Sequence, residues 1–363
     1  IKKILPNNNY VIVSTRIEQI NEIYLSKKII FYIIKNFYRH SLKQNYLTIL
    51  IKLITPKIVL THISDSEDFH IISKILKNKI EFIAIQTYNP SMFDSMFSEK
   101  GKKNFFIPKF FCYGEFDKLF YKKKKVNIES FETIGSIKSS LSYEYAKSEG
   151  LKINPNKYDI CLISEAHEIL NGDFWQVKNL ADSFGLVAEF TYKLCKKHNL
   201  SVVLSGKSGK EEKGAEREIY FYKHYLKDYD FEVIQPTYEK REYSSYINIM
   251  QSKVTIALFS TMLREAISFG KKILSFNTVG HPKIQFPGPD IEFPQESICI
   301  LKKPSYELFE ERVLNILSIT NEEYSSQIGK EKSFIMEPTV NTASVVRKRL
   351  KEITAQNINI NSK

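Results

Sequence analysis

The sequence lacks the features that mark several large classes of protein. No apolar run approaches the ~20 residues that a helix needs to cross a bilayer, and the nearest candidate, 46–54, is short and contains Lys52. Only four cysteines are present, widely spaced and without a CxxC pair, which indicates free thiols in a reducing compartment. The chain begins at Ile1 with no leader-like stretch, and we expect an N-terminal domain truncated at its start.

Several catalytic motifs are missing as well. No GxGxxG follows a strand and no GxSxG is present, so the common dinucleotide and hydrolase signatures are absent. The stretch SGKS at 205–208 is not a P-loop, because the first glycine of that motif would fall at Ser201. The DxD-like triplet 228–230 lies between a helix and the start of a strand, opposite the sheet edge where ligands bind. We therefore expect no metal and no bound cofactor.

The composition is that of an ordinary globular protein, with 43% hydrophobic, 13% aromatic and 26% charged residues. Its net charge of +12 is concentrated at one end, because residues 1–150 carry 24 basic and 14 acidic groups, whereas residues 151–363 carry 29 and 27. Either a coding bias toward lysine explains this asymmetry, or the basic half faces an anionic partner such as a phospholipid surface or a lipid-diphosphate acceptor. Nucleic acid is not expected as a partner, because arginine is scarce in the basic half and no nucleic-acid-binding signature is present.

Short apolar strands alternate with amphipathic helices in two series. Strands are expected at 57–62, 81–86, 110–113 and 131–134 in the first series, and at 158–163, 201–204, 231–235, 254–259, 272–276 and 297–301 in the second. This alternation predicts parallel sheets covered by helices on both faces. We expect an α/β protein of two Rossmann-like domains facing across a cleft, with an N-terminal domain at 1–145, a linker at 146–157 and a C-terminal domain at 158–363.

The segment 254–277 is the most informative part of the second series. A strand leads directly into a helix that begins at Ser260 and Thr261, whose hydroxyls and free backbone N–H groups can bind a phosphate. One turn later, Arg264 could neutralise phosphate and Glu265 could accept hydrogen bonds from a ribose. The alternative is that Ser260 simply caps the helix and the following glycine ends it.

Strand, Ser-Thr, Arg-Glu-Ala, Gly-Lys-Lys and strand together resemble the donor-nucleotide motif of two-domain (GT-B) glycosyltransferases. The blocks VLTHISDSEDFH, EFIAIQTYNPS, KFFCYGEFDKLFY and FETIGSIKSSL resemble a bacterial surface-carbohydrate-biosynthesis family, more distantly related to capsule and Kdo-type transferases. The similarity covers most of 57–277. It departs at 86–88, where Gln-Thr-Tyr stands in place of the family's usual Gln-Asn-Gly.

The resemblance implies that the C-terminal domain holds a nucleotide-sugar donor as substrate and the N-terminal domain holds the acceptor. It assigns Ser260, Thr261 and Glu265 to the donor site. At the ends of neighbouring strands, Gly206 and Lys207 would approach the phosphates and Gln235 the base, although a simple loop role is an equal alternative for each.

Catalysis requires a group that deprotonates the acceptor hydroxyl, or a carboxylate nucleophile. Asp65, which follows the first strand, is the preferred base, and an N-capping role is the alternative. Glu165, which follows the first strand of the second domain, is the second candidate. His281, in a loop after the 272–276 strand, is a further group that could reach the donor.

These expectations combine into one interpretation with two rivals. The sequence predicts a metal-independent glycosyltransferase that extends a surface glycan, either lipopolysaccharide O-antigen or capsule. It would be cytoplasmic and peripheral on the inner face of the membrane, where lipid-linked acceptors lie. The alternatives are a sugar-nucleotide epimerase on the same fold, or a non-catalytic scaffold protein of glycan assembly.

Overall fold

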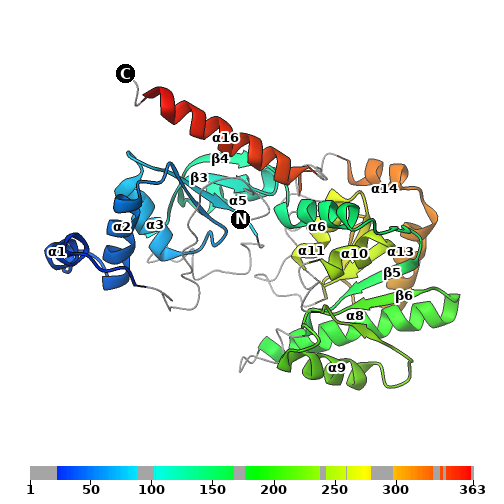
Figure 1. Ribbon diagram of the computed structural model, residues 1–363. Coiled ribbons are helices and arrows are strands. Elements are labelled where there is room, and N and C mark those ends of the chain that lie inside the picture. The colour runs from blue at the N-terminus through cyan, green and yellow to red at the C-terminus, as the bar shows by residue number, and fades with distance from the viewer. Residues whose placement is uncertain are drawn as a thin grey trace.

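The computed structural model describes two α/β domains, each built on a parallel sheet flanked by helices (Figure 1). The residues described are 23–87, 102, 104–166, 176–237, 243–258, 260–278, 297–329, 336–337 and 341–360, without the side chains of 176–180 and 356–360. All strand pairings in both sheets are parallel. The predicted fold class, two Rossmann-like domains, is confirmed.

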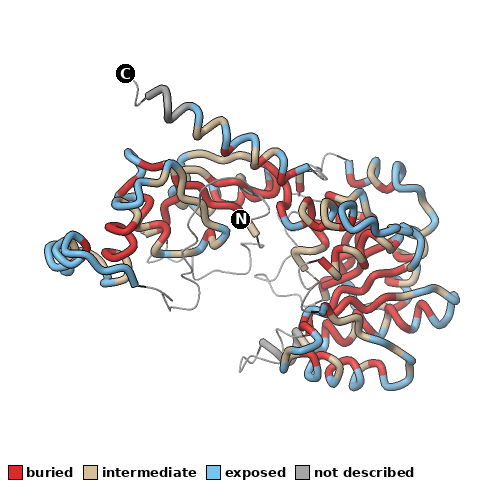
Figure 2. The backbone as a smooth tube through the Cα atoms, in the orientation of Figure 1, coloured by how far each residue is buried: buried red, intermediate tan, exposed pale blue. Residues whose placement is uncertain are grey.

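The N-terminal domain has a four-stranded sheet in the order β1-β2-β3-β4. Its elements are α1 (Lys27–Asn36), α2 (Leu42–Ile54), β1 (Ile58–Thr61), α3 (Glu67–Leu76), β2 (Glu81–Ile85), β3 (Phe106–Cys112), α5 (Glu115–Lys123) and β4 (Asn127–Thr133). The central strands β2 and β3 consist largely of buried apolar residues, as a sheet covered on both faces requires (Figure 2).

The C-terminal domain has a six-stranded sheet in the order β10-β9-β8-β5-β6-β7. Its elements are β5 (Tyr158–Ile163), α8 (Gln176–His198), β6 (Val202–Ser205), α9 (Lys213–Tyr225), β7 (Val233–Ile234), α10 (Ser244–Met250), β8 (Ser252–Ala257), α11 (Thr261–Ser268), β9 (Lys272–Phe276), β10 (Ile300–Leu301), α13 (Tyr306–Ser318) and α14 (Asn321–Ile328). All four cysteines are free and buried, which confirms the expectation from their spacing.

In the second sheet, the direction in which successive strands are added reverses once. From β5 the chain adds β6 and β7 on one side, then returns to add β8, β9 and β10 on the other. The boundary between β5 and β8 is therefore a topological switch point, where the connections leave in opposite directions. In open α/β sheets ligands bind outside the carboxyl ends of the strands at such a point.

Two helices make packing contacts across the predicted domain boundaries. Helix α6 (Ile137–Ser148) begins within 1–145 and extends into the predicted linker; it packs against α10 and α11 of the C-terminal domain and against the last helix of the chain, and its Ile137 lies in a core with residues of the N-terminal sheet. Helix α16 (Thr342–Ile360) ends the chain but returns to the N-terminal domain, where Val346 and Leu350 join a core with Ile83 and Phe111 (Figure 1). Each domain thus contributes one helix to the packing of the other.

Candidate functional site

Glu165 lies at the switch point between β5 and β8. It follows β5 within a buried segment, and its Oε2 accepts a hydrogen bond of 2.9 Å from the backbone N–H of Leu258, just past the end of β8. This bond fixes a carboxylate, 8% exposed, between the two strands from which the connections diverge. The sequence prediction that Glu165 stands at the carboxyl edge of the second sheet is consistent with this position.

The loop after β6 lies beside it and is organised by a carboxylate that the sequence did not reveal. Glu218, on α9 and fully buried, accepts hydrogen bonds from the backbone N–H groups of Lys207 (3.0 Å) and Ser208 (3.3 Å), and from the Ser164 hydroxyl. A Cβ at Gly206 would come within 2.9 Å of the Val233 side chain and 3.1 Å of the Glu218 carboxylate. Glycine at 206 is therefore required by packing, whether or not a ligand approaches.

Lys207 places a positive charge next to these two carboxylates. Lys207 is exposed as a whole. Partial desolvation of its amine nevertheless lowers the pKa of Lys207 below its ordinary value, and the negative charges of Glu165 and Glu218 oppose that lowering. The charges of Lys207 and Glu165 therefore interact. An anion that approached the carboxyl edge of β6 would meet this lysine at the surface.

The start of α11 forms the third part of the edge. Ser260 caps the helix, because its side chain accepts a hydrogen bond of 3.3 Å from the Met262 N–H. Thr261, the first helical residue, is half-buried. The helix begins directly beyond β8, so its positive end is at the same sheet edge as Glu165 and Lys207. The capping role foreseen for Ser260 is confirmed, and a phosphate role stays a prediction for both residues.

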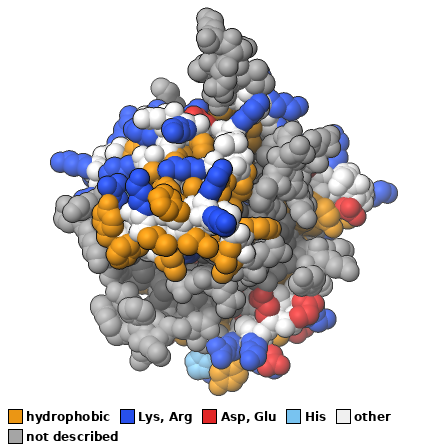
Figure 3. All heavy atoms as spheres, turned by 60° about the vertical axis from the view of Figure 1, so that its left-hand side comes forward, with side chains coloured by type: hydrophobic (Ala, Val, Ile, Leu, Met, Phe, Trp, Pro, Cys, Tyr) orange, Lys and Arg blue, Asp and Glu red, His pale blue; other side chains and the backbone are white. Residues whose placement is uncertain are grey.

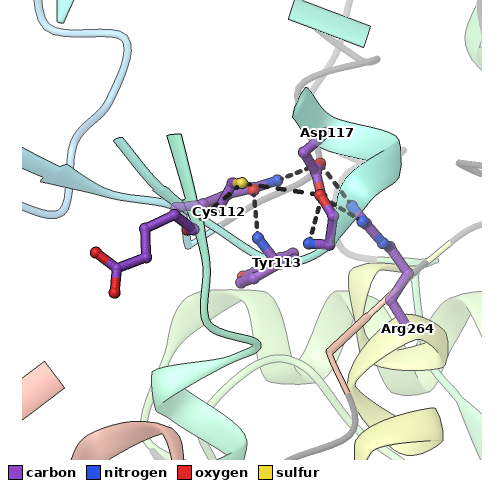
Figure 4. A network of polar contacts seen from close by, with 7 residues as sticks. Cys112, Tyr113, Asp117 and Arg264 are labelled. Carbon is purple, nitrogen blue, oxygen red and sulfur yellow. Dashed lines mark hydrogen bonds and ion pairs between the residues drawn. The ribbon is translucent and has the colours of Figure 1, made fainter. Parts of the chain in front are cut away.

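Arg264 lies in the interface between the domains and has a protein partner there. It is fully buried, and its guanidinium forms a bidentate ion pair with Asp117 of α5, at 2.6 and 3.1 Å (Figure 4). The same carboxylate accepts bonds from the Gln86 side chain (2.7 Å) and from the Gly114 N–H (3.2 Å), and Gln86 in turn accepts from the Tyr113 N–H (3.0 Å). A nucleotide phosphate would have to compete with Asp117 for this arginine.

Glu265 is also engaged between the domains. Its carboxylate accepts hydrogen bonds from Ser136, the residue that caps α6 (2.5 Å), and from the Tyr246 hydroxyl (2.8 Å). Burial raises the pKa of Glu265 above its ordinary value, and both hydrogen bonds counteract that rise. Its assignment to a ribose stays a prediction, and a ribose that bound there would share the carboxylate with these two donors.

The remaining predicted residues lie apart from this edge or within loops. Gln235 follows β7, and its amide donates to the Ala215 carbonyl (3.0 Å), which is the loop role foreseen as an alternative. Asp65 is exposed on the turn after β1, and Ser66 rather than Asp65 caps α3, which begins at Glu67. His281 lies outside the described residues.

The groups that the sequence analysis missed share one property: each acts on a residue far away in the chain. Each of them makes at least one hydrogen bond or ion pair to a group between 10 and 147 positions away: Glu218, Asp117, Gln86, Ser136 and Tyr246. Gln86, Asp117 and Ser136 do fall within the sequence blocks that resemble the carbohydrate family. Their buried positions among polar neighbours could not be deduced from those blocks.

No group of three or more histidine, cysteine, aspartate or glutamate side chains suited to hold a metal ion occurs within the described ranges. Two hollows on the described surface lie in the N-terminal domain, one at the amino ends of β2 to β4 and one beside α1 and α3. Across the helices that the structure describes, none is long and apolar enough to span a membrane.

Comparison with solved structures identifies proteins of the same fold. UDP-GlcNAc 2-epimerase from Neisseria meningitidis, bound to UDP-GlcNAc, is 15% identical with a TM-score of 0.54, covering 86% of this chain and 80% of that one. The Methanocaldococcus jannaschii UDP-GlcNAc 2-epimerase, in complex with UDP-GlcNAc and UDP, is 11% identical with a TM-score of 0.50, covering 86% and 80%. Sucrose-phosphate synthase from Thermosynechococcus elongatus is 10% identical, with a TM-score of 0.49 over 92% and 81%. At these identities the likeness to the two epimerases, whose TM-scores are at least 0.5, shows the fold alone.

Sequence comparison with curated proteins gave no significant match. A family described as "putative O-antigen biosynthesis protein" matches residues 151–337, which is slightly more than half of the chain and contains Glu165, the β6 loop and α11. The chain belongs to this O-antigen biosynthesis family.

Proposed function

We propose that the protein is a glycosyltransferase that moves a sugar from a nucleotide-sugar donor to a glycan or lipid-linked acceptor during surface-polysaccharide assembly. One observation carries the proposal: Glu165, Lys207 and the start of α11 gather at the topological switch point of the C-terminal sheet. The family assignment supplies the pathway class, and the fold is one that holds nucleotide sugars in the epimerases named above.

The three parts of the edge suit different steps of sugar transfer. Lys207 and the N–H groups at the start of α11 would stabilise the nucleotide diphosphate as its bond to the sugar breaks. Glu165, held by the Leu258 N–H, would take the proton from the acceptor hydroxyl or attack the sugar as a nucleophile. Asp65 stays an alternative base on the acceptor side. We expect activity to persist in EDTA.

An epimerase is the second candidate, because the two structural likenesses with TM-scores of at least 0.5 described above are both UDP-GlcNAc 2-epimerases. The two reactions differ in their products. A glycosyltransferase releases the nucleotide only when an acceptor is present, whereas an epimerase converts one nucleotide sugar into another without an acceptor. A scaffold would do neither.

A thermal-shift screen against CMP, UDP, GDP and dTDP tests the donor site. A nucleotide at 100 times its Kd should add about 2.7 kcal/mol of stability. We expect one nucleotide to raise Tm, and the rise to shrink in Lys207→Ala but not in Lys210→Ala, an exposed lysine of the same loop. Absence of a shift with every nucleotide, in folded protein, would overturn the donor-site assignment.

Glu165→Gln tests the chemistry separately. The glutamine oxygen can still accept from the Leu258 N–H, so folding and nucleotide binding should be preserved. We expect turnover of the nucleotide sugar to fall by about 10²–10⁴-fold, as for loss of a general base. Product analysis by mass spectrometry with and without membrane-derived acceptor then distinguishes transfer from epimerisation. Unchanged turnover in Glu165→Gln would transfer the role of base to Asp65.

A further inference from the structure

The N-terminal helix α1 exposes an unusual concentration of large apolar side chains. Nine of the seventeen exposed large hydrophobic residues in the described part of the chain lie between 23 and 42. On the helix itself and just beyond it they are Ile30, Phe31, Ile34, Phe37 and Tyr38, exposed by 48 to 70%. Figure 3 shows hydrophobic side chains gathered together with lysine and arginine on the face of the molecule that carries this region.

The spacing of these residues gives α1 two apolar faces. Ile29 is buried and Tyr32 and Ile33 are half-buried, so this face packs on the core of the N-terminal domain. Ile34 lies four residues after Ile30 and three after Phe31, and all three are exposed on the outer face. Packing against the domain therefore accounts for one face only, and a contiguous outer apolar patch is typical of an interaction site.

The charge around this outer face has one sign. Residues 23–64 contain seven lysine and arginine residues and no aspartate or glutamate. Lys27, Lys28, Lys35 and Arg39 are all exposed on or beside α1. Exposed apolar side chains interleaved with basic ones are the pattern of helices that lie in the interface of an anionic bilayer.

A hollow of about 690 Å³ adjoins the end of α1. It is lined by Arg39, His40 and Lys74, with the polar side chains Gln44 and Asn104, and is therefore suited to an anionic headgroup. The one carboxylate in its lining, Glu67, accepts a hydrogen bond of 2.8 Å from Asn104.

We propose that the outer face of α1, formed by Ile30, Phe31, Ile34, Phe37 and Tyr38 with Lys27, Lys28, Lys35 and Arg39, binds the surface of an anionic phospholipid bilayer. The apolar side chains would enter the acyl boundary and the basic ones would contact headgroup phosphates. A second copy of the chain is disfavoured as the occupant, because the face would then meet its own positive charge. This inference rests on the proposed function only through its lipid-linked acceptor, which would lie at a membrane, and it needs no catalysis.

Co-sedimentation with vesicles tests the proposal on the full chain. We expect binding to vesicles containing phosphatidylglycerol, weak binding to phosphatidylcholine alone, and loss of binding as salt rises. Phe31→Ser with Ile34→Ser should weaken binding about tenfold or more, because both side chains are over 60% exposed and removal leaves the core intact. Tyr220→Ser, which removes a 75% exposed aromatic of α9, is the matched control and should bind as the parent does.

A paired charge variant tests the basic component. Lys27→Gln with Lys28→Gln should reduce binding about fivefold for each lysine. The matched control, Lys302→Gln with Lys303→Gln, removes two adjacent exposed lysines of the C-terminal domain and should have little effect. Equal losses in both pairs would show a general charge effect and overturn the assignment to α1.

Two further outcomes would overturn the proposal. Failure of the parent protein to bind anionic vesicles is one. The other is a dimer by light scattering that dissociates in Phe31→Ser with Ile34→Ser, which would identify the occupant as a second copy. Because vesicle binding and sugar turnover are measured separately, failure of one leaves the other proposal standing.

Discussion

Among the titratable residues between 62 and 70, which follow β1, His70 is the one that the fold buries. Its side chain lies against the Phe105 ring, with ring centroids 4.3 Å apart, and its Nδ1 is 3.0 Å from the Phe106 carbonyl oxygen. Burial lowers the pKa of His70 to about 4, and the carbonyl contact only partly opposes this shift. The histidine is thus a neutral core residue and not a proton carrier at neutral pH.

This shift predicts a pH dependence of stability. In the unfolded chain His70 protonates near its ordinary pKa of 6.5, whereas in the folded protein it stays neutral until about pH 4. The unfolded state therefore binds more protons between these values, and the free energy of unfolding should fall by up to about 3 kcal/mol as pH drops from 6.5 to 4. Urea unfolding at a series of pH values measures this slope.

His70→Leu should remove that part of the slope. The Phe106 carbonyl keeps a donor in the variant, because the Ser73 hydroxyl also bonds to it at 3.2 Å. His224→Leu, which removes an exposed histidine of α9, should leave the slope unchanged. If parent and His70→Leu lost stability in parallel below pH 6.5, the histidine would have to be protonated in the folded state.

At the scale of elements, the hydrophobic pattern of the sequence was sufficient to predict a strand or helix where that element buries apolar residues. The sequence predicted β5 at 158–163 as observed. It missed α6, whose buried residues are mainly serines and therefore show no apolar periodicity. Two of those serines have partners distant in sequence, Ser139 in Ser268 and Ser140 in the backbone N–H of residue 343, whereas Ser142 donates to the Lys138 carbonyl one turn earlier.

For the candidate site, the sequence predicted which residues lie at the sheet edge but not what they contact. Residues at the ends of β5, β6 and β8 could be named because parallel strands direct their carboxyl ends to one edge. What those residues contact could not be deduced, since Arg264 and Asp117 are 147 positions apart and each is unremarkable in its own segment. Arg264 and Glu265, which the sequence predicted to bind the ligand, are buried in the fold and already bond to protein side chains.

Helix α16 gives a prediction about the contribution of a single element. Leu350 is 4% exposed and packs in the small core that α16 shares with the sheet of the N-terminal domain. Leu350→Ala should lower the free energy of unfolding by about 2–5 kcal/mol, because it leaves a cavity beneath the helix. Lys351→Ala, on the exposed side, should change it by about 0.5 kcal/mol or less. Denaturant unfolding compares the two, and similar small effects would mean that α16 is not docked in solution.

At the scale of the whole molecule, the two domains are joined by polar contacts that are out of reach of solvent. The Arg264–Asp117 pair has no exposed side-chain surface on either partner. The guanidinium also lies over the rings of Tyr113 and Phe116, at 5.2 and 5.5 Å from their centroids. A buried pair of this kind contributes little relative to apolar packing, but removal of one partner leaves a buried charge without compensation.

Asp117→Ala should therefore destabilise the protein by about 3–5 kcal/mol. Glu144→Ala is the matched control, because it removes another bidentate carboxylate–arginine pair, with Arg347, whose side chains are 38% and 29% exposed. For Glu144→Ala we expect a destabilisation of about 0–1 kcal/mol, since solvent screens that pair. The comparison requires urea unfolding of both variants under the same conditions. If Asp117→Ala cost no more than Glu144→Ala, water would have to reach Arg264, and the interface would be an open contact between domains instead of a dry one. A large cost confined to Asp117→Ala would instead show that the pair is shielded from solvent in the folded protein.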